Sequence, residues 1–368
     1  MSLVLYTPGH GLITDSLILH GIIRILAVAG VYNAKVERLG DRFLVKIDNN
    51  VNLNDVTSIF KNSELAQLLK SSAKLKFDVK LETPPLNKIF SLNIDKAHNN
   101  KWAENVYEIL DGTRTSGLDL SSLTYYDHKS QLREGRGGKN KTLYLPMSSI
   151  YGKYTVKDYG AKFSQYKVCD TCFLLASLGL LYGAYALVAR QGRDKRPLLM
   201  TIVPRDRMEA RDLLVLQRLL EGYEEVNIKD IPILATPVYA LSAGETLISL
   251  DSPAEVVTWK LSLTGNSQRS SQRSLDVVTL QFNTIVEFIA RLKHEVPEWP
   301  RLVECLRTED GYVILSDLTI ALNYDRTPLR AYEVIREILS YAVKEARKGR
   351  RVCEELLHRH YKIANILV

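Results

Sequence analysis

The segment 129–141, KSQLREGRGGKNK, carries the residue types that bind phosphate groups. Five basic residues stand against the single acidic Glu134, so the net charge of the segment is +4. Cationic side chains displace counterions from a nucleic-acid backbone, and glycines let that backbone approach main-chain N–H groups. We therefore predict contact with nucleic acid here, against the simpler alternative of a solvated loop that binds nothing. The residues assigned to this contact are Lys129, Arg133, Arg136, Gly137, Gly138, Lys139 and Lys141.

Aromatic residues flank the same segment. Tyr125, Tyr126 and Tyr144 lie close to it in the sequence, and tyrosine rings stack on bases or ribose. The segment is not a P-loop, because Asn140 follows Lys139 where that motif requires Ser or Thr, and no glycine stands at the required distance. The prediction therefore rests on charge and glycine content.

A second basic stretch, 265–274, contains the sequence Ser-Gln-Arg-Ser twice. The duplication places Arg269 and Arg273 four residues apart among short hydrogen-bonding side chains. At the tip of a hairpin such arginines grip phosphates or read guanine, a contact that supplies about 1–3 kcal/mol of base discrimination. We assign both arginines to the nucleic-acid contact, with a plain flexible loop as the alternative.

The cysteines suggest a different chemistry. Cys169 and Cys172 have the spacing that zinc sites and redox centres use. A structural zinc site needs four ligands, however, and no second pair of this kind or nearby Cys/His pair follows in the sequence. Cys305 and Cys353 stand isolated. We therefore predict structural cysteines, with no metal and no cofactor, and keep zinc binding and redox catalysis as alternatives.

One compact group of residues would suit a nuclease or an acyl-transfer site, namely His10, Asp15, His20 and Arg24. The sequence shows no His-Asp dipeptide, paired acidic metal motif or Gly-x-Ser-x-Gly elbow beside them. We expect His20, which precedes Gly21, to be a satisfied core or interface histidine. The prediction is that no residue is catalytic, and a histidine- or metal-dependent nuclease is the alternative.

The composition is that of an ordinary globular protein. Of 368 residues, 46% are apolar and 25% are charged, which excludes wholesale disorder, and the net charge is +7. Four cysteines argue against a disulfide-dense secreted scaffold, and the absence of a signal-peptide pattern predicts a cytoplasmic protein. The uncharged stretch 173–189 reaches only the lower limit of a membrane-spanning helix. We predict instead a buried helix, without membrane association, in which another backbone approaches Gly179 and Gly183.

These candidate residues must be positioned by a folded core, which we call the frame. The segment 3–31 is predicted to lie at its centre. The pattern predicts a strand over Leu3–Tyr6, a turn at Pro8–Gly11, and an apolar helix capped by Thr14 or Asp15 that the rest of the chain must cover. Polarity alternates in 34–39 and 42–47 around Gly40, which indicates a β-hairpin.

The overall fold class predicted is α+β, or mixed α/β. An α/β domain over residues 1–275 contains a basic, glycine-rich excursion at about 111–160, and a mainly helical domain follows over residues 276–368. The frame is thus expected to present its basic segments as long loops, which in compact proteins are usually functional or disordered.

Residues 6–30, YTPGHGLITDSLILHGIIRILAVAG, resemble the start of the Apern-subtype large subunit of the archaeal type I-A CRISPR interference (Cascade) complex. Chain length, basic charge and the helical last third are compatible with that family. The resemblance implies a non-catalytic subunit of a ribonucleoprotein. Its implied partners are CRISPR RNA, target double-stranded DNA, other subunits of the complex, and a helicase–nuclease recruited in trans.

In such complexes base pairing reads the target sequence, while protein reads a short flanking motif and backbone shape. We therefore expect the two basic segments to contact guide RNA and target DNA near the protospacer-adjacent motif. The first helix and the helical region are expected to hold partner subunits. A purely structural scaffold subunit, without nucleic-acid affinity, is a further alternative.

Overall fold

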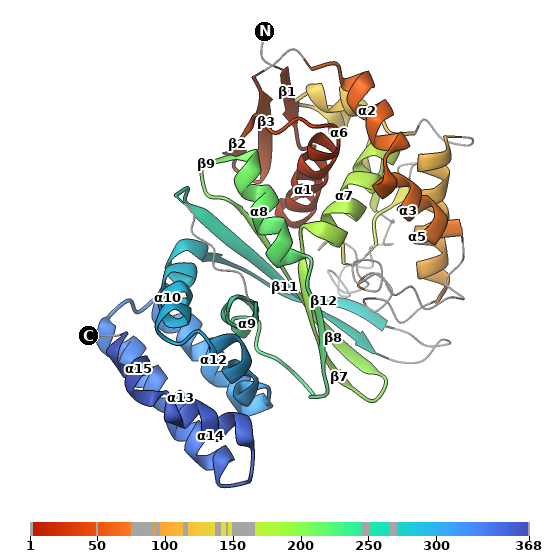
Figure 1. The fold of residues 1–368 in the computed structure, drawn as a ribbon. Helices are drawn as coiled ribbons and strands as arrows, with labels where there is room; N and C mark the ends of the chain where they lie inside the picture. The colour runs from red at the N-terminus through yellow and green to blue at the C-terminus, as the bar shows by residue number, and fades with distance from the viewer. Residues whose placement is uncertain are drawn as a thin grey trace, which may run out of the picture.

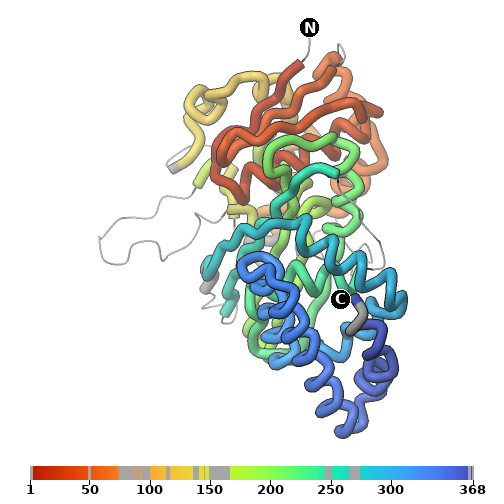
Figure 2. Tube along the Cα trace, turned by 90° about the vertical axis from the view of Figure 1, so that its left-hand side faces the viewer, coloured from red at the N-terminus to blue at the C-terminus, as the bar shows by residue number. Residues whose placement is uncertain are grey.

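The computed structural model describes residues 3–48, 51–74, 88, 92, 96–112, 117–136, 141–144, 146–148, 166–244, 251–264 and 271–366. Within them the chain forms a mixed α/β fold with a four-stranded, a five-stranded and a three-stranded sheet (Figure 1). The sheets occupy the first two-thirds of the chain and helices the last part, as the sequence predicts. In Figure 2 the N-terminal sheet and the C-terminal helices lie at opposite ends of the molecule.

The N-terminal sheet has the strand order β1-β3-β2-β9, with all neighbours antiparallel. The predicted first strand and the predicted hairpin are both confirmed, and Gly40 turns the hairpin at a positive φ of 67°. That left-handed conformation suits glycine because it has no Cβ atom. The strands are β1 (Leu3–Tyr6), β2 (Ala34–Leu39), β3 (Arg42–Ile47) and β9 (Arg207–Glu209).

Two buried helices, α1 (Leu12–Val28) and α7 (Asp170–Tyr182), cross at the centre of the molecule. A Cβ atom at Gly179 would overlap the carbonyl oxygen of Leu17, and one at Gly21 would overlap that of Leu175. The predicted backbone approach to Gly179 is therefore confirmed, whereas the one predicted for Gly183 is wrong, because the His20 side chain lies there. Only residues without a side chain allow the helices to come this close.

Two further local predictions in this region are wrong. The cap of α1 is Gly11, because the Thr14 hydroxyl donates to the carbonyl of Met147 and the Asp15 carboxylate accepts from the main-chain N–H of Gly9. The uncharged stretch 173–189 is also not one helix: α7 ends at Tyr182 and the chain re-enters a sheet as β7 (Tyr185–Gln191). No helix in the described ranges combines the length and apolarity needed to cross a membrane.

The central sheet has the order β10-β7-β8-β11-β12, in which the β10–β7 pair is parallel and the others are antiparallel. Figure 1 shows α1, α7 and α8 on one face and α9 and α10 on the other. Strand β8 is covered on both sides, which explains its long apolar run. The remaining bounds are β8 (Asp194–Pro204), α8 (Ala210–Leu220), β10 (Tyr223–Val226), α9 (Ala235–Ala243), β11 (Ala254–Thr264), β12 (Ser271–Gln281) and α10 (Phe282–Glu295).

The segment 53–168 carries the smaller elements. Helix α3 packs beside α5, α2 packs against α1 and α3, and a three-stranded sheet of order β4-β6-β5 adjoins α7. Of the excursion expected at 111–160, the described part contains η1, α6, β4 and β5. Their bounds are α2 (Leu53–Asn62), α3 (Glu64–Lys74), α5 (Lys96–Asp111), η1 (Leu120–Thr124), α6 (His128–Gln131), β4 (Gly135–Arg136), β5 (Lys141–Thr142) and β6 (Tyr166–Val168).

The chain after β12 is helical, as predicted. Strand β12 runs to Gln281, past the boundary expected at residue 275, and the division into two domains stays a prediction. Cys305 and Cys353, which appear isolated in the sequence, form a disulfide between η2 and α14. The bounds are α11 (Trp299–Leu302), η2 (Val303–Leu306), α12 (Glu309–Asn323), α13 (Pro328–Ala346), α14 (Arg351–His358) and α15 (His360–Asn365).

The helical part is joined to the central sheet through a carboxylate on β10. Glu224 accepts a hydrogen bond from the Tyr239 hydroxyl of α9 at 2.8 Å and pairs with the Arg307 guanidinium, which follows η2, at 2.7 Å. The Tyr185 hydroxyl of β7 donates to the same carboxylate at 3.3 Å. One side chain thus connects two strands, a helix and the start of the helical part.

Candidate nucleic-acid interface

The basic segment 129–141 begins in α6 and runs into β4, the edge strand of the three-stranded sheet. The structure describes its residues up to 136 and again at 141, whereas Gly137, Gly138 and Lys139 lie outside the described residues. Arg136 is on β4, opposite Tyr166 on β6. The segment is therefore attached to the frame at both of its described ends.

The described cations of this segment divide into two kinds. The Lys129 ammonium donates to the carbonyl of Gly9 at 3.2 Å, and that of Lys141 pairs with Glu108 at 2.5 Å. Arg133, by contrast, is exposed, and its backbone has the left-handed φ of 51°. Lys129 and Lys141 thus serve to hold the segment, and Arg133 is presented to solvent.

Two of the three flanking tyrosines lie on the surface. Tyr125 and Tyr126 are 55% and 56% exposed. The guanidinium of Arg42 lies 4.6 Å from the Tyr126 ring centroid, and its Nη1 atom donates to the main-chain oxygen of Tyr126 at 2.7 Å. The stacking role predicted for Tyr144 is wrong, because Tyr144 is only 7% exposed. Arg42, a residue that sequence reasoning missed, adds a cation to this surface.

We call Arg42, Tyr125 and Tyr126, together with the exposed Arg133 seven residues further along the chain, the tyrosine–arginine patch. It combines aromatic faces, on which bases of any sequence can stack, with cations for the phosphate backbone. Arg42 reaches it from the β2–β3 hairpin, which no pattern near the basic segment could reveal.

The second predicted basic stretch follows β11, and its described residues 271–274 form the start of β12, which pairs antiparallel with β11. Arg273 lies on β12 opposite Ser262, whereas Arg269 lies outside the described residues. In Figure 1 the end of β11 lies at the right of the central sheet, away from α6 at the top. The described parts of the two basic segments therefore do not lie side by side, and their common use in one contact stays a prediction.

Beside the basic segment lies a buried group of metal-ligand types: His128, Glu134, Cys169 and Cys172. Their candidate ligand atoms all lie within 4.8 Å of one another. The Nε2 atom of His128 is 3.2 Å from the Cys172 sulfur and 3.5 Å from both the Cys169 sulfur and Glu134 Oε1. The expectation that the cysteine pair lacks further ligands nearby is wrong, because the fold brings in two residues from about 40 positions upstream.

The charges in this group shift one another's pKa. Burial lowers the pKa of His128, but hydrogen bonds and charge attraction from Cys169 and Glu134 outweigh it and raise the pKa to about 10. The hydrogen bond with Cys172, together with that of His128, lowers the pKa of the Cys169 thiol despite its burial. His10 also joins the group, since its Nε2 atom lies 2.8 Å from Glu134 Oε2 and its Nδ1 atom 2.8 Å from the Tyr166 hydroxyl.

The four residues that would suit a nuclease do not form one site. His10, Asp15 and His20 are each at most 2% exposed. His20 is hydrogen-bonded to the carbonyl of Ile202 at 2.8 Å, which confirms the expected core histidine. Arg24 pairs with Glu221 and lies 4.1 Å from the Tyr182 ring centroid. Each side chain thus has its own structural partner.

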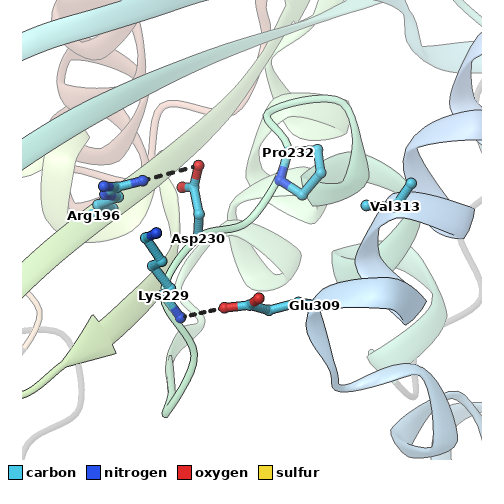
Figure 3. Close-up of a pocket in the computed structure, with 6 residues that line it drawn as sticks. All are labelled: Arg196, Lys229, Asp230, Pro232, Glu309 and Val313. Atoms are coloured by element: carbon cyan, nitrogen blue, oxygen red, sulfur yellow. Dashed lines mark hydrogen bonds and ion pairs between the residues drawn. The ribbon is translucent and has the colours of Figure 1, made fainter.

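A cleft of about 630 Å³ lies where the central sheet meets α12 (Figure 3). The Arg196 guanidinium pairs with Asp230 at 3.0 Å, and Glu309 accepts from the main-chain N–H of Lys229 at 2.8 Å. Because these polar groups satisfy one another, we interpret the cleft as a junction between the two parts of the fold. It is lined by Arg196, Lys229, Asp230, Pro232, Glu309 and Val313.

Comparison with known proteins identifies the relatives of this chain. Residues 3–367 match the family model described as CRISPR-associated protein (Cas_Csa4). A curated protein of Thermoproteus tenax, named CRISPR system associated protein Cas8, is 33% identical over 347 residues, which cover 91% of each of the two chains. The matched range includes both basic segments and the buried His–Glu–Cys group.

Proposed function

The chain belongs to the Cas_Csa4 family of CRISPR-associated proteins, the large-subunit family of the type I-A interference complex, and on this premise we propose that it binds the nucleic acids of that complex without cutting them. Guide RNA and target DNA near the protospacer-adjacent motif are the proposed ligands. Base pairing would read the target, and this subunit would hold backbone and flanking duplex. Strand cleavage would fall to a helicase–nuclease recruited in trans.

The observation that carries this proposal is the tyrosine–arginine patch at the root of the basic segment. Its two tyrosines are more than half exposed, and a guanidinium already lies against one of the rings. Exposed tyrosine rings offer a face on which a base can stack, and arginines attract the phosphate backbone. A contact of this kind is tolerant of sequence, as a subunit serving many guides requires.

A salt titration tests the proposal. Replacement of Arg133, Arg136 and Lys139 by Ala should weaken duplex binding and lower the slope of log K against log salt by up to about 3, because each lost phosphate contact contributes about 0.9. The matched control replaces the exposed Arg336, Arg347 and Arg351 of the helical part, which removes the same charge. Binding is measured by fluorescence anisotropy with duplex DNA and single-stranded RNA.

Three results would contradict the proposal. An equal loss of slope in the control variant would mean that overall charge, and not the basic segment, governs binding. A full-length protein that binds neither duplex nor single strands at low ionic strength would favour a purely structural scaffold. Cleavage of DNA or RNA with Mg²⁺ or Mn²⁺ that disappears on replacement of His10 or His20 would favour the nuclease alternative.

A further inference from the structure

The buried group His128, Glu134, Cys169 and Cys172 is not explained by nucleic-acid binding. Its members come from α6, from the turn before β4 and from the first turn of α7. The side chains of His128 and Glu134 are 1% and 0% exposed, and Cys172 is fully buried. Placing a carboxylate, an imidazole and two thiols in contact away from water carries an unfavourable desolvation free energy. A group bound between them would offset this free energy.

The distances from His128 Nε2 to the other three ligand atoms fit one tetrahedral ion. With zinc–sulfur bonds near 2.3 Å and zinc–nitrogen or zinc–oxygen bonds near 2.0–2.2 Å, neighbouring ligand atoms stand about 3.3–3.8 Å apart. The three separations from His128 Nε2, to Cys172, Cys169 and Glu134, are 3.2, 3.5 and 3.5 Å. All four ligand atoms lie within 4.8 Å of one another, so the longer separations must shorten by up to about 1 Å to close the site.

The surroundings orient the ligands as second-layer partners of a metal do. The Nδ1 atom of His128 lies 2.7 Å from the carbonyl oxygen of Ser122 and donates its proton there, so Nε2, which faces the cysteines, is the atom that would bind the ion in place of its own proton. The second carboxylate oxygen of Glu134 is held by His10 at 2.8 Å. Cys169 caps the N-terminus of α7, where the helix dipole favours a thiolate.

The donor set selects the class of metal. Thiolate and imidazole ligands suit Zn²⁺, while Mg²⁺, Ca²⁺ and Mn²⁺ prefer all-oxygen sites. Four protein ligands leave no open position, which is typical of structural zinc and not of catalytic zinc. We propose that Cys169, Cys172, His128 and Glu134 bind one structural Zn²⁺ ion that fastens the root of the basic segment to α7.

The position of the site gives it a role in the fold. His128 directly precedes the basic segment and Glu134 lies within it, so a shared ion would close residues 128–134 into a loop. Arg133, with its left-handed backbone, stands next to one of the ligands. That the loop then presents cations to nucleic acid rests on the proposed function, whereas metal binding does not.

The test measures metal on the untagged, full-length protein. We expect about one zinc ion per chain by plasma mass spectrometry, and Co²⁺ exchange should give the visible bands and sulfur-to-metal charge transfer of a tetrahedral thiolate site. His128→Ala and Cys172→Ser should lose the ion. His128→Cys should keep it, because cysteine supplies an equivalent ligand. His358→Ala, at an exposed histidine of α14, is the matched control and should keep it.

Three outcomes would overturn the proposal. These are a protein without zinc after expression in zinc-supplemented medium, a Co²⁺ spectrum without charge transfer from sulfur, and a Cys169–Cys172 disulfide in the natively purified chain. Because metal content is measured on the wild type, the result does not depend on whether a variant folds. It is also independent of nucleic-acid binding, so failure of one proposal is distinguishable from failure of the other.

Discussion

The Nε2 atom of His20 lies 2.8 Å from the carbonyl oxygen of Ile202, which connects α1 to strand β8 across the core. The Gln217 amide donates to the carbonyl oxygen of His20 at 2.9 Å and lies 3.3 Å from the other ring nitrogen. The imidazole is fully buried, and this burial lowers its pKa to about 4. His20 is therefore neutral in the folded protein at neutral pH.

This burial predicts a pH dependence of stability. The unfolded state gains a proton on His20 below about pH 6.5 and the folded state only near pH 4, so the stabilising contribution of the neutral ring is lost as the pH falls through this window. The difference corresponds to about 3 kcal/mol of unfolding free energy. His20→Gln, which keeps a donor but does not titrate, should show a shallower fall in urea melts between pH 6.5 and pH 4. A slope equal to the wild type, with exposed His358→Gln as control, would contradict this account.

The tyrosine–arginine patch predicts a stacking contribution that salt does not screen. Tyr126→Ala should weaken the binding of single-stranded RNA by about 1–3 kcal/mol, whereas Tyr126→Phe should retain most of the affinity, since the ring stacks and not the hydroxyl. Tyr324→Ala is a suitable control because this tyrosine is 67% exposed in the helical part. Equal losses from Tyr126→Ala and Tyr324→Ala in anisotropy titrations would remove Tyr126 from the contact.

The proposed zinc site predicts that a chelator loosens the root of the basic segment. Treatment with 1,10-phenanthroline should speed trypsin cleavage after Lys129 and Arg133, because these bonds lie between two of the ligands. Cleavage after Arg193, in the exposed turn between β7 and β8, provides an internal control and should not change. Peptides are followed by mass spectrometry over time. Unchanged cleavage after Arg133 would mean that the metal does not order this loop.

The disulfide predicts a redox-dependent stability of the helical part. Cys305 and Cys353 are 48 residues apart, and a loop of this length contributes about 4 kcal/mol in the chain-entropy description, with measured values typically about 2–4 kcal/mol. Cys353→Ser or reduction of the wild type should lower the midpoint of thermal unfolding. Reduction of Cys353→Ser should add no further loss. A further loss would show that the reductant acts elsewhere.

Local patterns of the sequence predict local structure here. Gly40 between two alternating segments gives the first hairpin. This feature depends on neighbours a few positions away, where turn residues and side-chain alternation decide the outcome. Gly179 belongs with it, because a glycine within an apolar helix indicates close packing.

Features that depend on distant partners could not be predicted in this way. The apolar run 173–189 is split because Gly183 packs against His20, 163 residues earlier, and the chain beyond it joins the central sheet. His128 and Glu134 join Cys169 only because α6 and β4 pack beside the start of α7. Arg42 reaches Tyr126 across 84 positions. The spacing of these residues in the sequence does not predict their contacts, because the contacts form only when distant segments pack together.

The carboxylate of Glu224 has a mechanical consequence. Because it holds Tyr185, Tyr239 and Arg307 at once, the helical part cannot swing away from the sheet without breaking these bonds and leaving a partly buried charge without its counterion. Movement of the last third of the chain is therefore coupled to movement of the core through the contacts of this one carboxylate.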